Sequence, residues 1–393
     1  MELFSLLHPD IQKFIDANME SSVIQLALQK NPFPETNWTQ ILAQVAGKQK
    51  AKYKLPTWFC TSEILYPTKI SMEQTSSEKT AAYKASLISG NSIIDLTGGF
   101  GVDDFYFSKQ FKTVVHCEVN VALSNMVAHN FEKLNVDNCS FYIGDSHAIL
   151  EQLQRNFDWI YIDPSRRNDT KGKVFLLKDC LPNVVDLMDH YFKYANHILI
   201  KTAPILDITA GLNELKNVKK IHIVAVDNEV KELLWEISKD YLGSIEIITA
   251  NLKKTEHEYF EFSLGNKTIH AHYNLPKKYL YEPNAAIMKS GGFDEEGMQF
   301  DLDKLHAHSQ LYTSETIQDF PGRIFKIEHC IPYQKNEIKT FLENTKANIT
   351  IRNFPDTVEL IRKKWKIKEG GNRYCFFTTD MNNRKIVLLC AKI

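Results

Sequence analysis

A chain of 393 residues is longer than one hydrophobic core usually supports, so we expect two or more domains. Its composition, 44% apolar and 24% charged residues, is that of a globular protein and excludes a disordered one. The net charge is −1, but 15 basic and 7 acidic residues give the segment 323–393 a charge of +8. A basic C-terminal module attached to an acidic body favours a polyanionic partner.

The N-terminal sequence, MELFSLLHPDIQKF, carries early acids and a proline, unlike a secretory signal, and no window approaches a membrane span. The seven cysteines include no CxxC pair, and the histidine pairs 270/272 and 306/308 have no third ligand nearby in the sequence. We therefore predict a cytoplasmic protein with no metal, no membrane partner and no evident obligate protein partner.

The first 71 residues read as an N-terminal helical region, with apolar residues at helical spacing in HPDIQKFIDAN, SSVIQLALQK and NWTQILAQVAGKQKAK. A short motif follows, EQTSSEKTAAYKASLI. Thr75 and Glu78 have the spacing of a capping box, which predicts a helix from about Ser76 to Leu87.

Residues 72–265 alternate between strand-like and helix-like segments, which predicts a Rossmann-like, doubly wound α/β domain with a parallel sheet. The expected strands are 92–97, 113–118, 139–144, 157–163, 197–202, 219–226 and 244–251. The stretch DCLPNVVDLMDHYFKYA, which contains Cys180, reads as a helix, and so does VDNEVKELLWEI, with Lys231 and Glu232.

Two small α+β modules should complete the chain. Residues 266–322 are rich in proline, glycine and acids, and we interpret them as an intermediate module. Residues 323–393 contain a βαβ-like pattern followed by a hairpin that turns at Asn382 and Asn383.

The ends of the first three strands carry groups suited to a nucleoside cofactor. Glycines after a strand and before a helix let the backbone approach a ligand, and the carboxylate of Glu118 could accept hydrogen bonds from ribose hydroxyls. Asp145 could meet an adenine amino group or could simply cap the next helix. The candidates in the first strand and its loop are Asp95, Thr97, Gly98, Gly99 and Gly101.

The fourth strand ends in DWIYIDPSRRND. There Asp163 could accept a hydrogen bond from a target N–H, Pro164 fixes a turn, and Ser165 leaves room for a base. The order of Asp95 and the glycines, Glu118, Asp145 and the Asp-Pro pair resembles the class I S-adenosylmethionine-dependent methyltransferases. This resemblance implies S-adenosylmethionine as the cofactor.

Two further resemblances narrow the family. EQTSSEKTAAYKA is similar to the helix that precedes the first strand in several RNA methyltransferases, which implies that Gln74 and Thr75 lie by the cofactor; a plain capped helix is the alternative. YIDPSRR, YLYEPNAAIMKSGG and ANITIRNFPDTVELIRKKWKIKEGGNRYCFFTT together resemble the bacterial methyltransferases that end in a THUMP-like domain after a ferredoxin-like module. That group implies an RNA substrate.

The residues around Asp163 favour methyl transfer to nitrogen or oxygen without a covalent enzyme intermediate. No aromatic residue follows Pro164 to stack a flipped base, and no cysteine nucleophile stands near the ends of the fourth and fifth strands. Arg166 and Arg167 could bind an anion or a guanine edge, or could form salt bridges with acids such as Asp169. Lys201, at the end of the fifth strand, adds a further cation.

The cluster RKKWKIKEGGNRY near the C-terminus interleaves cations and aromatic residues, an arrangement that suits RNA. Trp365 could stack a base or belong to the core. The candidate RNA-binding cations are Arg362, Lys363, Lys364, Lys366 and Arg373. The leading hypothesis is an S-adenosylmethionine-dependent methyltransferase of structured RNA, tRNA or rRNA. The rivals are an RNA-binding or assembly protein with little activity and a small-molecule methyltransferase.

Overall fold

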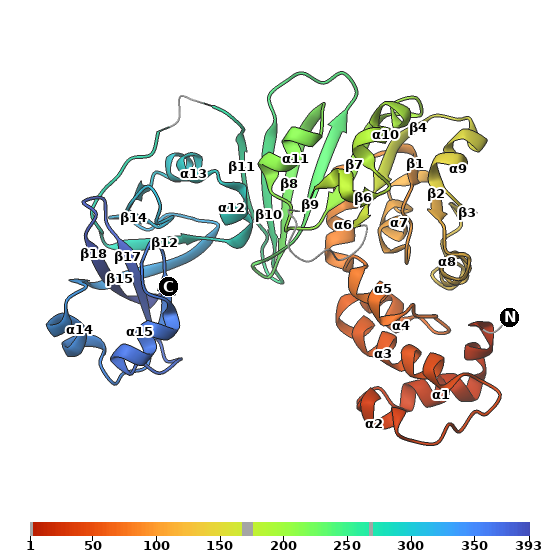
Figure 1. Ribbon diagram of the computed structural model, residues 1–393, viewed down its shortest axis with the longest axis horizontal. Helices are drawn as coiled ribbons and strands as arrows, with labels where there is room; N and C mark the ends of the chain where they lie inside the picture. The colour runs from red at the N-terminus through yellow and green to blue at the C-terminus, as the bar shows by residue number, and fades with distance from the viewer. Residues whose placement is uncertain (1–2, 167–175, 267–269) are drawn as a thin grey trace. The chain divides into compact units, whose positions relative to one another are not determined.

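The computed structural model describes residues 3–166, 176–266 and 270–393 (Figure 1). The chain divides into two compact units, Met1–Lys219 with Leu234–Leu242 and Lys220–Leu233 with Gly243–Ile393. Within the described ranges, no helix is long and apolar enough to cross a membrane.

The first unit begins with a group of helices that packs against the following α/β region. Asn37 caps one of them by accepting a hydrogen bond from the backbone N–H of Thr39 at 2.9 Å. Trp58 is fully buried, and its ring lies 4.8 Å from that of Phe105 in α7 (Val102–Phe107). The helices are η1 (Leu3–Leu7), α1 (Pro9–Ala17), α2 (Val23–Ala27), α3 (Trp38–Lys54), α4 (Pro56–Cys60), α5 (Lys69–Gln74) and α6 (Glu78–Leu87).

The helix α6 ends at Leu87 as predicted, but its cap is not the predicted Thr75. Ser77 is the N-cap, and it exchanges hydrogen bonds with Thr80 in a capping box. Thr75 is instead the C-cap of α5. The pattern was misread because serine and threonine fill several adjacent positions, each of which is a competent cap.

The predicted parallel sheet is present in the first unit, where the strands stand in the order β7-β4-β1-β2-β3 (Figure 1). Their carboxyl ends therefore lie at one edge, where ligands bind in open α/β sheets. The strands are β1 (Gly90–Asp95), β2 (Phe111–Glu118), β3 (Cys139–Ile143), β4 (Phe157–Ile162) and β7 (Ala195–Thr202).

The segments between these strands are mostly the expected helices. Cys180 is an exception, since it lies in a two-residue strand and not in a helix, although it is buried. The connecting elements are α8 (Val121–Lys133), α9 (Ser146–Leu153), β5 (Ser165–Arg166), η2 (Leu177–Asp179), β6 (Cys180–Leu181), α10 (Val184–Tyr191) and α11 (Ile208–Glu214).

The segment predicted as a helix around Lys231 and Glu232 is a strand, β9 (Glu229–Ser238), next to β8 (Val218–Val226). Asp227 and Asn228 join the two strands, and both have positive φ, 48° and 67°. Such a turn suits a two-residue hairpin, so β8 and β9 run antiparallel. The sheet pattern is therefore mixed, although the α/β fold class is as predicted.

The second unit contains β10 (Glu246–Leu252), which pairs parallel with β8 and antiparallel with β11 (Glu258–Ser263). A separate seven-stranded sheet has the order β13-β14-β12-β15-β18-β17-β16. Its strands are β12 (Tyr279–Pro283), β13 (Asp303–Lys304), β14 (Tyr312–Ser314), β15 (Gly322–Pro332), β16 (Asn348–Ile351), β17 (Arg373–Thr379) and β18 (Lys385–Lys392).

The helices of this unit are α12 (Ala285–Ser290), α13 (Phe293–Gln299), α14 (Lys335–Leu342) and α15 (Val358–Trp365). The predicted hairpin at Asn382 and Asn383 is present between β17 and β18. Because β12 pairs with β15, one sheet continues through residue 322. The proposed boundaries at 71/72, 265/266 and 322/323 stay predictions.

Candidate functional site

The loop after β1 requires glycine for two different reasons. Gly99 and Gly101 have φ of 55° and 70°, a region that residues with a Cβ rarely adopt. At Gly98 the reason is contact, since a Cβ would lie 2.2 Å from the buried ring of His116. The loop therefore lies tightly on the sheet, with the helix α7 starting directly after it.

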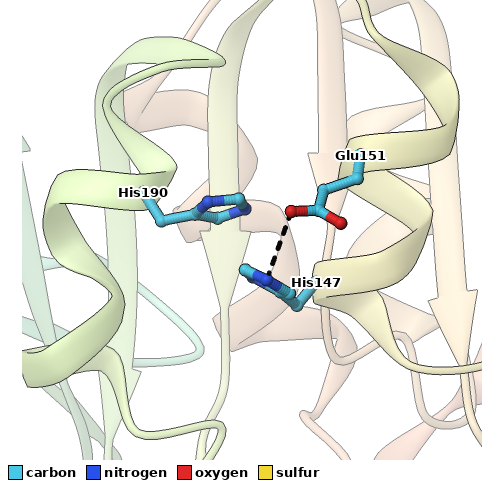
Figure 2. Close-up of side chains that lie close together, drawn as sticks. All are labelled: His147, Glu151 and His190. Carbon is cyan, nitrogen blue, oxygen red and sulfur yellow. Dashed lines mark ion pairs between the residues drawn. The ribbon is translucent and has the colours of Figure 1, made fainter.

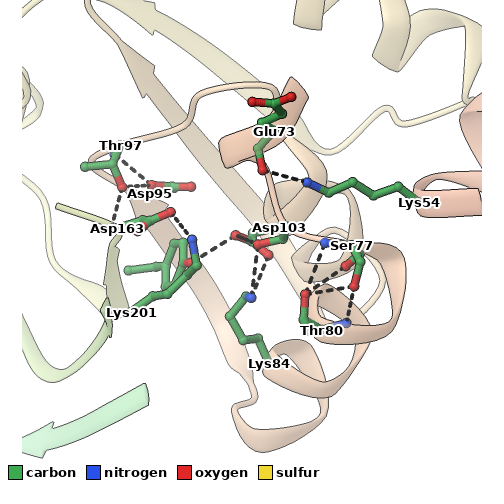
Figure 3. Close-up of polar contacts among 12 residues, drawn as sticks. Lys54, Glu73, Ser77, Thr80, Lys84, Asp95, Thr97, Asp103, Asp163 and Lys201 are labelled. Carbon is green, nitrogen blue, oxygen red and sulfur yellow. Dashed lines mark hydrogen bonds and ion pairs between the residues drawn. The ribbon is translucent and has the colours of Figure 1, made fainter. Parts of the chain in front are cut away.

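Thr97 connects the ends of β1 and β4. Its backbone N–H and its hydroxyl both donate to Oδ1 of Asp95, at 2.7 and 3.0 Å, and the hydroxyl accepts a hydrogen bond from the backbone N–H of Asp163 at 2.7 Å (Figure 3). The glycine loop and the Asp-Pro segment are thereby held in one arrangement, although 66 residues separate them in the chain.

Glu118, at the end of β2, holds the same loop from the other side. One carboxylate oxygen accepts the backbone N–H of Gly99 at 3.0 Å, and the other accepts that of Asn120 at 2.7 Å. The side chain is half-buried. A carboxylate has about four acceptor positions, so two hydrogen bonds leave it able to accept more from a ligand.

Asp163 forms an ion pair with Lys201 (Figure 3). The two residues follow Ile162 and Ile200, which are register partners in the adjacent strands β4 and β7, so their side chains meet at the sheet edge. About a third of the Asp163 side chain is exposed, against 12% of Lys201. Asp163 thus remains accessible to a ligand, while the more buried Lys201 holds its carboxylate in place. The sequence did not predict this ion pair.

A second polar cluster lies under the loop, around Asp103 of α7. Its carboxylate accepts hydrogen bonds from Ser76 and Tyr161, both at 2.9 Å. It also pairs with the fully buried Lys84 at 3.3 Å (Figure 3). It joins the helix α6 and strand β4 to the start of α7. Removing either partner of the buried Lys84–Asp103 pair would leave an uncompensated charge, so the pair is costly to break. The cluster therefore holds the start of α7, and with it the glycine loop, in position. The sequence analysis did not identify Asp103 or its partners, although the motif GVDD, which contains Asp103, lies at the end of the glycine loop.

Three buried ionisable groups complete the floor of the site. Burial raises the pKa of Asp95 well above its usual range, and the nearby Asp104 raises it further. Burial likewise raises the pKa of Asp104 and lowers that of His116. His116 Nδ1 and Asp104 Oδ2 are 2.7 Å apart, so the two side chains share a hydrogen bond.

The other predicted cofactor residues have local structural roles. Gln74 is exposed at the end of α5, and Thr75 follows it. Asp145 is the N-cap of α9 and accepts a hydrogen bond from Ala148 N–H at 3.1 Å, the role that was weighed against adenine recognition. Cofactor contact by these three residues stays a prediction.

In the Asp-Pro segment, Pro164 is buried and Ser165 is exposed. Ser165 and Arg166 form β5, which pairs with Leu181 and Cys180. The side chain of Arg166 and the whole of Arg167 lie outside the described residues, so the hypotheses for them stay predictions.

Some of the predicted RNA-binding cations of the C-terminal module hydrogen-bond within the protein, and some are exposed lysines. Arg362 donates to the carbonyls of Ala347 and Ile367, and Arg373 donates to that of Phe341. Lys364 donates to the hydroxyl of Tyr333 at 3.1 Å. The exposed lysines of this group are Lys363, Lys364 and Lys366. Trp365 is only 6% exposed and packs in the domain core, as one of its two predicted roles requires.

The second unit also has a cavity of about 380 Å³, lined mostly by polar and charged residues, that sequence reasoning did not anticipate. Glu258, on its wall, accepts hydrogen bonds from Asn251, Lys253 and Asn284. The lining residues are Asp227, Asn228, Asn251, Lys253, Lys254, Thr255, Glu258, Asn284, Gly322 and Arg323.

Comparisons with known families identify the C-terminal modules. Residues 279–321 match a ferredoxin-like domain, and residues 322–392 match a THUMP domain-like family. The crystal structure of a proposed methyltransferase from Porphyromonas gingivalis W83 is 29% identical, with a TM-score of 0.87. The likeness covers 100% of this chain and 99% of that one. A comparison with curated proteins gave no match.

Two other solved structures resemble part of the chain. An rRNA methylase from Streptococcus thermophilus is 11% identical with a TM-score of 0.31, covering 41% of this chain and 93% of its own. TrmK from M. capricolum, solved with S-adenosylhomocysteine, is 16% identical with a TM-score of 0.31, covering 41% and 68%. Scores this low add nothing to the assignment.

The sheet order, the glycine loop and the full-length likeness together define a class I methyltransferase fold. The chain shares its full-length architecture with the Porphyromonas gingivalis structure, and residues 279–392 match a ferredoxin-like domain followed by a THUMP-like domain.

Proposed function

We propose that this protein is an S-adenosylmethionine-dependent methyltransferase that modifies a nitrogen or oxygen atom of a nucleotide in structured RNA, tRNA or rRNA. The observation that carries the proposal is the link at the sheet edge, where Thr97 joins Asp95 to Asp163. The loop proposed to bind the cofactor and the acid proposed to hold the target atom are thereby fixed next to each other. As an enzyme of RNA modification it would work in the cytoplasm.

The residues present fit the cofactor. Gly99 and Gly101 have left-handed φ and no side chain, so a bound ligand can contact the backbone of this loop directly. Glu118 is half-buried at the end of β2 and keeps acceptor capacity for ribose hydroxyls. Asp145 and Thr75 are further candidates for contacts with this group.

S-adenosylmethionine supplies a methyl group on a positively charged sulfur, and transfer to a nucleophile needs chiefly positioning. The chain's part is to hold the target atom. The accessible carboxylate of Asp163 accepts a hydrogen bond from a target N–H or O–H and so orients its lone pair. Lys201 holds that carboxylate in position through the ion pair.

The absence of a covalent step is supported by the state of two cysteines, one next to Glu118 in the sequence and one paired with Arg166 across β5 and β6. Cys117 and Cys180 are both buried, and burial raises the pKa of the Cys117 thiol. A buried, protonated thiol is a poor nucleophile. Carbon methylation through a cysteine adduct is therefore disfavoured at this site.

RNA as the substrate is supported by the C-terminal module. It carries a charge of +8, and exposed lysines such as Lys363 and Lys366 are available to phosphates. The cavity lined by Lys253, Lys254 and Arg323 is a second candidate contact for a nucleotide. An RNA-binding protein with little activity is the rival reading, and it gives no role to the link between Thr97 and Asp163.

The test has two parts. Calorimetry with S-adenosylmethionine should give one site per chain, and mass spectrometry of nucleosides should find one methylated nucleoside missing from the RNA of cells that lack the gene. Binding of RNA without any binding of the cofactor at high micromolar concentration would favour the rival.

A further inference from the structure

Two helices of the first unit bring together three potential metal ligands that the methyltransferase proposal does not use. His147 and Glu151 are four residues apart on α9, so they share one face of the helix. His190 projects toward them from α10 (Figure 2). One ligand atom from each residue lies within 4.8 Å of the other two.

The distances are close to those of a metal site. The Nε2 atom of His147 and the Oε1 atom of Glu151 are 3.5 Å apart, and the two imidazole rings have centroids 3.9 Å apart (Figure 2). Two ligands about 2.1 Å from a tetrahedral zinc ion are about 3.4 Å apart. The separation of His147 and Glu151 is therefore already that of two ligands of one ion.

The hydrogen-bond inventory points the same way. Nε2 of His190 is shielded from solvent and has no hydrogen-bond partner among the residues described. A nitrogen in this state can coordinate a cation without losing a hydrogen bond. The two imidazoles and the carboxylate lie close enough together for a cation to bind all three.

We propose that His147, Glu151 and His190 form a binding site for a divalent transition metal, with zinc the best match. Two imidazole nitrogens and one carboxylate oxygen are common zinc ligands, and a water molecule completes four-coordination. The ion ties α9 to α10. Because α9 starts at its cap Asp145, the metal also stiffens the segment that follows β3.

The experiment uses full-length protein without a histidine tag, treated with a chelator and titrated with zinc sulfate. We expect one ion per chain and a rise in the midpoint of thermal unfolding. The variants His147→Ala and His190→Ala should each weaken binding at least about tenfold, whereas His257→Ala, at another exposed histidine, should leave binding unchanged.

Cobalt provides an independent readout. Visible absorption typical of a four-coordinate site should appear on adding Co²⁺ to the parent protein and be absent in His190→Ala. Glu151→Gln, a conservative change on the helix surface, serves if a histidine variant unfolds. Equal zinc affinity in the parent protein and the variants, or no binding tighter than about 100 µM, overturns the proposal.

Discussion

The hydroxyl of Thr97 accepts a hydrogen bond from the backbone N–H of Asp163 at 2.7 Å while donating to Asp95. One short side chain thus fixes the distance between the glycine loop and the carboxylate proposed to hold the target atom. If the loop binds the cofactor, Thr97 sets how far its methyl group lies from that carboxylate.

Replacing Thr97 by valine keeps the shape and removes both hydrogen bonds of the hydroxyl. A backbone donor left without its partner costs about 1 to 3 kcal/mol, so we expect methyl transfer to fall about tenfold or more. The matched control is Thr113→Val on β2, whose exposed hydroxyl makes only a 3.4 Å contact with Asn91. Unchanged kcat and cofactor affinity in Thr97→Val would mean that the link has no role.

Glu118→Gln should weaken binding of S-adenosylmethionine about tenfold, because a neutral amide is a poorer acceptor for ribose hydroxyls and for Gly99. Calorimetry measures the change directly. Glu132→Gln, at an exposed glutamate on the neighbouring helix α8, should leave the dissociation constant as it is. Equal affinities for the parent and Glu118→Gln would remove the ribose assignment.

Substitutions in the ion pair of Asp163 and Lys201 should lower the rate of methyl transfer much more than the affinity for the cofactor. We expect Asp163→Asn and Lys201→Met each to lower kcat about 100-fold and to leave cofactor affinity within about threefold. The double variant should be little worse than either single one, because the residues act as a unit. Lys219→Met, which alters a different ion pair, is the control. Additive losses would show that the two side chains act independently.

The second unit should become less stable as the pH rises. Burial raises the pKa of Glu296 to about 8, against 4.5 for the free side chain, so between these values the folded protein keeps a proton that the unfolded chain has lost. This linkage makes unfolding easier at pH 8 than at pH 5 by about 3 to 5 kcal/mol at most. Hydrogen exchange of α13 measures the effect locally.

Glu296→Gln should flatten that pH dependence, while Glu295→Gln, at its half-buried neighbour, should retain it. A parent protein whose α13 exchange shows no loss of protection between pH 5 and 8 would contradict the assignment.

Charge removal from the C-terminal module should weaken RNA binding without affecting the cofactor. Lys363→Ala with Lys366→Ala removes two exposed cations, so the slope of log affinity against log salt should fall by about 1 to 2. Lys385→Ala, in the same module but bound to Thr379, is the control. An unchanged salt dependence would direct attention to the cavity at Lys253 and Lys254.

The sequence predicted the class of fold and most strands because alternating apolar runs and glycine-bearing turns are local signals. It failed at β9, where EVKELLWEI contains good helix formers. The competing signal was the Asp227–Asn228 turn, whose two positive φ angles commit the chain to a hairpin. Tertiary context there overrode helix propensity.

The site shows a similar division. The sequence predicted that Asp95, Glu118 and Asp163 lie together, because each stands at or directly after the end of a strand and parallel strands bring their ends to one edge. The pairing of Asp163 with Lys201 depends on the register of β4 and β7, which no local pattern encodes. The grouping of His147 with His190 likewise depends on how two helices lie on the sheet.

The most direct measurement is transfer of a radiolabelled methyl group from S-adenosylmethionine to RNA purified from cells that lack the gene. The parent protein should label one size class of tRNA or rRNA, and Asp163→Asn should not, although it still binds the cofactor. Cofactor binding by the parent protein with no label in any RNA, but with label in a small molecule, would contradict the account.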